Sequence, residues 1–179
     1  MLIDLLKQAA LEAGATAVGV TPVSEITFDP AFRDMCAANS CGKYGKCYMC
    51  PPDVGDINDL INEAKSYKDA FVFQYIAALE DSFDIEGMHE AKERFRAISF
   101  VLRDAISEHK DHALLLGAGG CGVCEECNKP KGLPCKAPDL ATPSLEAYGV
   151  HVSKLAPLAG MKYINGPDTV TYFGAVLLK

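Results

Sequence analysis

Eight cysteines, arranged in two groups, are the residues of this chain whose types and spacing point to chemistry. In the second group, Cys121, Cys124 and Cys127 form C-x2-C-x2-C, and Cys135 follows after seven intervening residues. Three thiolates at this pitch can each reach a different iron of a cube, which is typical of iron–sulfur ligation. Zinc sites usually combine two separated C-x2–4-C pairs, so zinc is the weaker interpretation of this group.

The second group can be compared with the bacterial ferredoxin pattern C-x2-C-x2-C-x3-C-P. Its first three positions match, whereas the interval before Cys135 is longer, so the match is partial. The glycines around it, Gly117, Gly119, Gly120 and Gly122, let backbone N–H groups approach cluster sulfurs, where hydrogen bonds tune the potential. We therefore expect a [4Fe–4S] cluster here.

The first group comprises Cys36, Cys41, Cys47 and Cys50, with the spacing C-x4-C-x5-C-x2-C-P-P. Four cysteines in so short a stretch predict one metal site, and we expect a second [4Fe–4S] cluster. Only one tight pair is present, so zinc is a stronger alternative here than at the second group. Spacing leaves open whether the two groups exchange a ligand, as in two-cluster ferredoxins.

The charge balance limits the classes of partner. The chain has 17 Lys and Arg against 24 Asp and Glu, a formal net charge of −7. Non-specific nucleic-acid binding depends on Lys and Arg that neutralise phosphates, so we expect no nucleic-acid partner. An acidic surface suits a basic redox protein instead, and a homo-oligomer is compatible with the sequence.

The cellular location bears on the state of the cysteines. The N-terminal stretch MLIDLLKQAALEAGA is interrupted by charges and has no positively charged n-region, so it does not resemble a signal peptide. No apolar run reaches the about 18 residues of a membrane span. We expect a cytoplasmic protein, where thiols stay reduced and serve as metal ligands rather than as disulfides.

Hydrophobic periodicity predicts a scaffold of alternating helices and strands around the cysteine loops. At 179 residues and 49% hydrophobic, the chain can bury a core, and we expect one domain over residues 1–179. The fold class is an α/β or α+β sandwich: a central sheet flanked by helices, with cluster-binding loops at 36–52 and 117–138. The expected helices are 2–13, 56–66 capped by Asp56, 84–110, 143–148 capped by Thr142, and 153–160 capped by Ser153; the expected strands are Thr16–Val20, Ala70–Ala77, Ala113–Leu116, Lys162–Ile164 and Thr169–Leu177, the last two as a hairpin, with 21–55 as a long loop.

Three segments together resemble a known family. They are CGKYGKCYMCPP, the CGVCEEC run with Cys135, and PSLEAYGVHV from Pro143 to Val152. The combination resembles a family of predicted metal-binding proteins of anaerobic bacteria and archaea, over about residues 36 to 155. The resemblance implies iron–sulfur binding and defines no activity. The family pattern has two closely spaced cysteines before Tyr-Gly; here Cys36 and Cys41 are farther apart and Cys47 is additional, which leaves the ligand set of the first site open.

A second resemblance is confined to the N-terminus. The stretch LIDLLKQAALEAGATAVGV is similar to the start of epoxyqueuosine reductases, which pair ferredoxin clusters with a corrinoid. It covers only a first helix and strand, an opening shared by many α/β domains.

Three functions follow from these patterns. The favoured one is electron transfer by two [4Fe–4S] clusters to or from a redox protein. The alternatives are a binding or scaffold module stabilised by zinc or iron–sulfur, and a cluster-dependent reductase or corrinoid-linked activating enzyme. The four histidines match no metal or catalytic pattern and no nucleophile elbow occurs, so the sequence shows no catalytic constellation.

Overall fold

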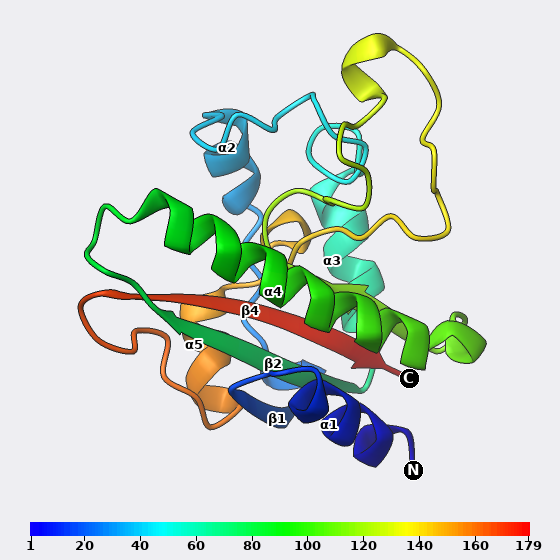
Figure 1. The fold of residues 1–179 in the computed structure, drawn as a ribbon. Coiled ribbons are helices and arrows are strands. Elements are labelled where there is room, and N and C mark those ends of the chain that lie inside the picture. Colours follow the sequence, from blue (N-terminus) through cyan, green and yellow to red (C-terminus); the bar gives the residue numbers. More distant parts are fainter.

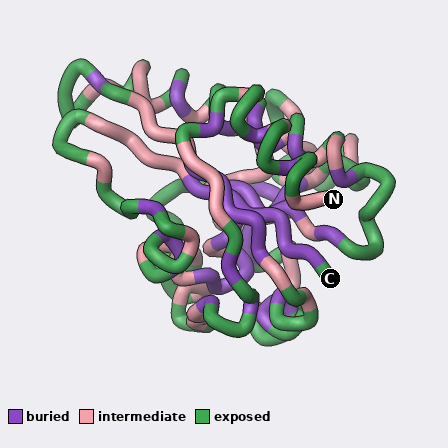
Figure 2. The backbone as a smooth tube through the Cα atoms, turned by 90° about the horizontal axis from the view of Figure 1, so that it is seen from below, coloured by how far each residue is buried: buried purple, intermediate pink, exposed green.

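The computed structural model describes residues 1–179 and contains one four-stranded antiparallel sheet in the order β1-β2-β4-β3. The central strands, β2 and β4, have ten residues each and pair from Asp69 opposite Leu178 to Ala78 opposite Thr169. The strands are β1 Ala17–Pro22, β2 Asp69–Ala78, β3 Ala113–Leu116 and β4 Thr169–Leu178. Figure 2 shows runs of buried positions in the middle of the sheet, which belong to β2, β3 and β4, whereas β1 has only one buried residue.

Helices cover both faces of the sheet because side chains of a strand alternate between its faces. Phe71 and Phe73 of β2 join the core under α1 and α4, whereas Ala70 and Val72 join the core under α3 and α5. The helices are α1 Leu2–Glu12, α2 Phe32–Ala37, α3 Ile57–Lys65, α4 Ile85–Ala105 and α5 Val152–Leu158, with short 3-10 turns at Val23–Glu25, Ser107–His109, Lys129–Lys131 and Glu146–Tyr148. The predicted fold class, a sheet flanked by helices, is confirmed.

The helix α4 is the longest element and positions one wall of the site described below. Its residues Phe95, Ile98 and Leu102 recur at helical spacing and are buried against the sheet, and Phe95 stacks on Phe73 with ring centroids 5.3 Å apart. Each such burial contributes about 1.5–3 kcal/mol. Asp84 caps the helix by accepting a hydrogen bond from Gly87 N at 2.8 Å. No helix of the structure is both long and apolar enough to cross a membrane.

The predicted C-terminal hairpin is wrong. Residues 162–164 form no strand, and β4 pairs instead with β2 on one side and β3 on the other. Both edges of β4 are therefore occupied, and the carbonyl of Lys162 accepts from Gln74 Nε2 and Asn165 Nδ2 rather than from a strand partner.

Several boundaries also differ from the predictions. The segment 21–55 is not a continuous loop, because it contains α2. The long helix ends at Ala105, before a 3-10 turn. Thr142 caps no helix: its hydroxyl donates to Leu140 O, and the predicted helix 143–148 is only a 3-10 turn at Glu146–Tyr148. Ser153 is not a cap either, because it lies within α5, where its Oγ hydrogen-bonds with His151 Nδ1. The cap at Asp56 is confirmed by its hydrogen bond from Asn58 N at 2.8 Å.

Candidate metal centre

Both cysteine loops extend from the same end of the molecule, beyond the sheet (Figure 1). They are joined directly: the Tyr48 hydroxyl of the first loop donates to Leu133 O of the second at 2.6 Å. Lys129 of the second loop forms a salt bridge with Asp53 and lies over the Tyr48 ring. Two segments about 80 residues apart in the chain thus form one unit.

The first cysteine group spans α2 and the turns that follow it. Cys36 lies on α2, Cys41 is exposed, and Cys47 and Cys50 are 5% and 9% exposed. Arg33, one turn before Cys36, fixes α2 to the loop by donating to Gly55 O at 2.6 Å. Burial raises the pKa of Cys36, and the positive charge of Arg33 partly offsets that effect.

Cys47 and Cys50 form a hydrogen-bonded pair. The Cys50 thiol donates to Cys47, which also accepts from backbone N–H groups that include that of Cys121; together these hydrogen bonds lower the pKa of Cys47 to about 5. The same hydrogen bond and burial raise the pKa of Cys50. Cys47 is therefore in contact with both cysteine groups, through Cys50 of its own group and the Cys121 N–H of the second.

The second cysteine group follows β3 through the glycine-rich turn. The N–H of Thr142 donates to Cys121 Sγ at 3.3 Å, while burial raises the pKa of Cys121. Cys121, Cys124, Cys127 and Cys135 together line a narrow, mostly apolar cavity, to which Cys47 also contributes. Cys47 of the first group thus lies in the same cavity as the four cysteines of the second group.

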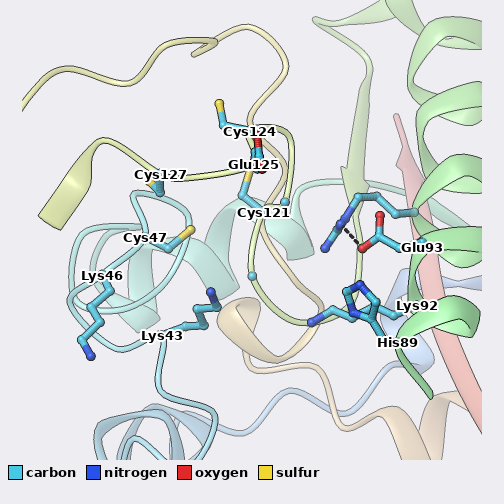
Figure 3. Close-up of a pocket in the computed structure, with 13 residues that line it drawn as sticks. Lys43, Lys46, Cys47, His89, Lys92, Glu93, Cys121, Cys124, Glu125 and Cys127 are labelled. Carbon is cyan, nitrogen blue, oxygen red and sulfur yellow. Dashed lines mark hydrogen bonds and ion pairs between the residues drawn. The ribbon is translucent and has the colours of Figure 1, made fainter. Parts of the chain in front are cut away.

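A larger polar cavity of about 680 Å³ lies between the cysteine loops and α4. One wall holds Cys47, Cys121, Cys124 and Cys127 with Lys43 and Lys46; the other is the face of α4 that bears His89, Lys92, Glu93 and Arg96. Lys43 and Lys92 extend into this space from opposite sides (Figure 3). Basic side chains thus lie beside the thiols.

The comparisons with known proteins give one match. The family model described as "Predicted metal-binding protein (DUF2284)" matches residues 20–178. The chain belongs to this family. No curated protein and no solved structure matches it. The match spans both cysteine groups and strands β2, β3 and β4, so the expected membership in a predicted metal-binding family is confirmed. The N-terminal similarity to epoxyqueuosine reductases gains no support.

The donor set of this member of the DUF2284 family fits a sulfur-ligated metal. All eight cysteines are free thiols, and soft thiolate donors select iron–sulfur clusters or zinc. Backbone N–H groups donate to Cys47 and Cys121, as they do around cluster sulfurs. No group of three or more Cys, His, Asp or Glu side chains stands arranged to hold a single metal ion.

The structure places the two predicted cysteine groups at one end of the molecule, and it adds a basic wall that sequence reasoning missed. His89, Lys92, Glu93 and Arg96 stand at i, i+3, i+4 and i+7 of α4, so they share one helix face. That periodicity is visible in the sequence, yet it predicts only a solvated polar face. The fold turns this face toward the cysteines.

Proposed function

We propose that this protein holds two [4Fe–4S] clusters on its eight cysteines and transfers electrons to or from a protein partner. The observation that supports the proposal is the convergence of two distant cysteine groups on one end of the molecule, where Cys47 lies next to Cys121. Electron transfer is favoured by short distances between centres, and this arrangement would place both centres in one compact unit.

The expected ligands are Cys36, Cys41, Cys47 and Cys50 for one cluster and Cys121, Cys124, Cys127 and Cys135 for the other. When bound, each cluster would supply a one-electron couple. The chain's own contribution is to hold the thiols: Arg33 fixes α2, Lys129 and Asp53 join the loops, and apolar residues such as Met49 and Val123 limit access of water.

The partner is proposed from charge alone. With a net charge of −7 before any cluster is added, the molecule would dock best on a basic redox protein. Association would then weaken as salt is added, because screening shortens the range of surface charges.

A cluster-dependent reductase is the second candidate. Such an enzyme needs room for a substrate beside its metal centre, and the cavity of about 680 Å³ against Cys121 and Cys124 provides that room. A module that uses metal only to stabilise its loops has no need for such a cavity.

The test is a redox titration of anaerobically purified protein, followed by EPR. Electron transfer predicts reversible reduction within the range of roughly −700 to +450 mV that such clusters cover. Metal that cannot be reversibly reduced would contradict electron transfer and leave the metal-stabilised module.

A further inference from the structure

We propose that the cavity between α4 and the cysteine loops binds a small oxyanion-bearing molecule, with a phosphate or carboxylate group held by Lys43, Lys92 and Arg96. The inference extends the proposed function by placing a small-molecule site beside the metal centre. It rests on the proposed function only where the test uses EPR spectra of the clusters.

The charge of the cavity lining is opposite to that of the chain. Four of its thirteen residues are Lys or Arg and two are Glu, on a protein with seven more acidic than basic residues. Of these four cations only Arg96 forms a salt bridge, to Glu93. Lys43, Lys46 and Lys92 therefore lack an acidic partner, although the chain has acids in excess.

Two of the cations lie against the glycine-rich turn. A methyl group at Gly122 would collide with the Arg96 guanidinium, and one at Gly119 would lie 3.5 Å from Lys92 Nζ. Glycine thus lets both side chains lie directly against the backbone on either side of Cys121. The N–H groups of Gly120 and Gly122, which also line the cavity, donate to no backbone carbonyl.

Lysine and arginine on opposite walls match the needs of an oxyanion. Arginine can bind phosphate or carboxylate with two parallel hydrogen bonds, and lysine adds a point charge. The volume of about 680 Å³ is within the 300–1,000 Å³ that small-molecule sites span. A phosphate is favoured over a single carboxylate because it brings a second negative charge to cations on two walls.

The competing explanation is that these cations only offset the negative charge of a cluster. Cys135, an expected ligand of the second cluster, does not line this cavity but lines the apolar one, which shares Cys121, Cys124 and Cys127 with it. A cluster on the second group would therefore lie at the cysteine wall, whereas Lys92 and Arg96 belong to the wall formed by α4. No hydrogen bond joins any of the four cations to a thiol.

The test is calorimetric titration of the anaerobically purified, metal-loaded protein with inorganic phosphate, pyrophosphate and succinate at low ionic strength. We expect saturable binding at one site, weakened about tenfold by each of Lys92→Gln and Arg96→Gln. Arg94→Gln is the matched control, because Arg94 lies on the same helix, pairs with Glu90 and does not line the cavity. Glu93→Gln should tighten binding, since it removes a negative charge.

The arms separate the possible results. Stronger binding of phosphate or pyrophosphate than of succinate identifies a phosphate site, and the reverse identifies a carboxylate site. No saturable binding of any probe, or binding that Lys92→Gln and Arg96→Gln leave unchanged, would overturn the inference. Lys43→Gln, an exposed position, serves as a further variant if Arg96→Gln does not fold.

Metal content and EPR spectra of each variant distinguish this inference from the proposed function. Ligand-dependent changes in the EPR spectrum with full iron content would support both. Full iron content without anion binding would contradict only the inference, and anion binding to a protein without iron would contradict only the proposed clusters. Loss of metal in Lys92→Gln or Arg96→Gln without anion binding in the unaltered protein would show that the cations serve the metal alone.

Discussion

Cys47 is the residue at which the two cysteine groups meet. It is almost fully buried, accepts a hydrogen bond from the Cys121 N–H and shares a cavity with all four cysteines of the second group. Cys41 belongs to the same group in the sequence but is exposed. The sequence pattern places the two residues in one motif, whereas their surroundings differ.

Replacing Cys47 should affect both metal sites. We expect Cys47→Ser to remove more than half of the about eight irons that two clusters would hold. It would remove an expected ligand of the first site and alter the cavity lined by the second group. The control is Cys41→Ser, which should lower iron at the first site only. Iron and sulfide analysis checks this, and equal losses in the two variants would contradict the shared position of Cys47.

At the scale of elements, β4 and α4 decide the fold and the site. Pairing of β4 with β2 brings together residues about 100 positions apart, which no local pattern reveals. The hairpin predicted from residues 162–164 and 169–177 does not form. The positions of β2 and β3 were predictable, because each strand contains a short apolar segment flanked by polar or glycine residues. The short helix α2 was not, because six residues give too few turns for periodicity.

The site, like the fold, combines features that local sequence predicts with features that depend on long-range packing. The two cysteine groups are recognisable in the sequence because the spacing within each group is local. The basic wall is not, since Lys92 and Arg96 become part of the site only when α4 packs beside the second loop. A polar helix face next to solvent and one next to a cavity have the same sequence pattern.

Gly174 tests the packing of β4. It pairs with Phe73, and a methyl group there would collide with the Phe73 ring and lie 3.0 Å from Leu116 O. We expect Gly174→Ala to lower the free energy of unfolding by about 1–3 kcal/mol through overpacking. Gly117→Ala is the control, because its nearest neighbour would be at an ordinary 3.7 Å. Denaturant unfolding measures both, and equal effects would contradict the close packing at Gly174.

The cap of α4 should make stability depend on pH. Hydrogen bonds from Gly87 N and Glu80 N hold the pKa of Asp84 below its usual range. The stabilisation is therefore complete above about pH 4, the pKa of an unfolded aspartate, and is lost as pH falls through the lower folded value.

The corresponding measurement is the melting temperature of metal-free protein at neutral and acid pH. Asp84→Ala should lower it at pH 7, and the difference from the unaltered protein should shrink below about pH 4. Asp84→Asn keeps a capping side chain and should retain most of the stability with no such dependence. A difference for Asp84→Ala that stays constant with pH would contradict the role of the carboxylate.

At the scale of the whole molecule, the helix–sheet body and the cysteine loops are stabilised differently. The two hydrophobic cores, one on each face of the sheet, include no residue from 36–52 or 119–141. The loops depend instead on hydrogen bonds and ion pairs such as Lys129–Asp53, and on any metal that they bind.

Metal removal should therefore affect the loops and spare the body. After chelation we expect far-UV circular dichroism to stay near that of the loaded protein, while backbone amides of the loops exchange faster with solvent. Lys129→Ala should speed metal loss to the chelator by weakening the contact between loops. Cooperative unfolding of the sheet on metal removal would contradict this division.

The measurement that tests the central claim most directly is iron and acid-labile sulfide content, with an EPR spectrum of anaerobically purified, dithionite-reduced protein. Two [4Fe–4S] clusters predict about eight irons and eight sulfides per chain, with spin-coupled S = 1/2 signals because both centres would lie at the end of the molecule where the cysteine loops meet. Zinc with little iron and no signal would contradict the account and leave a metal-stabilised module in its place.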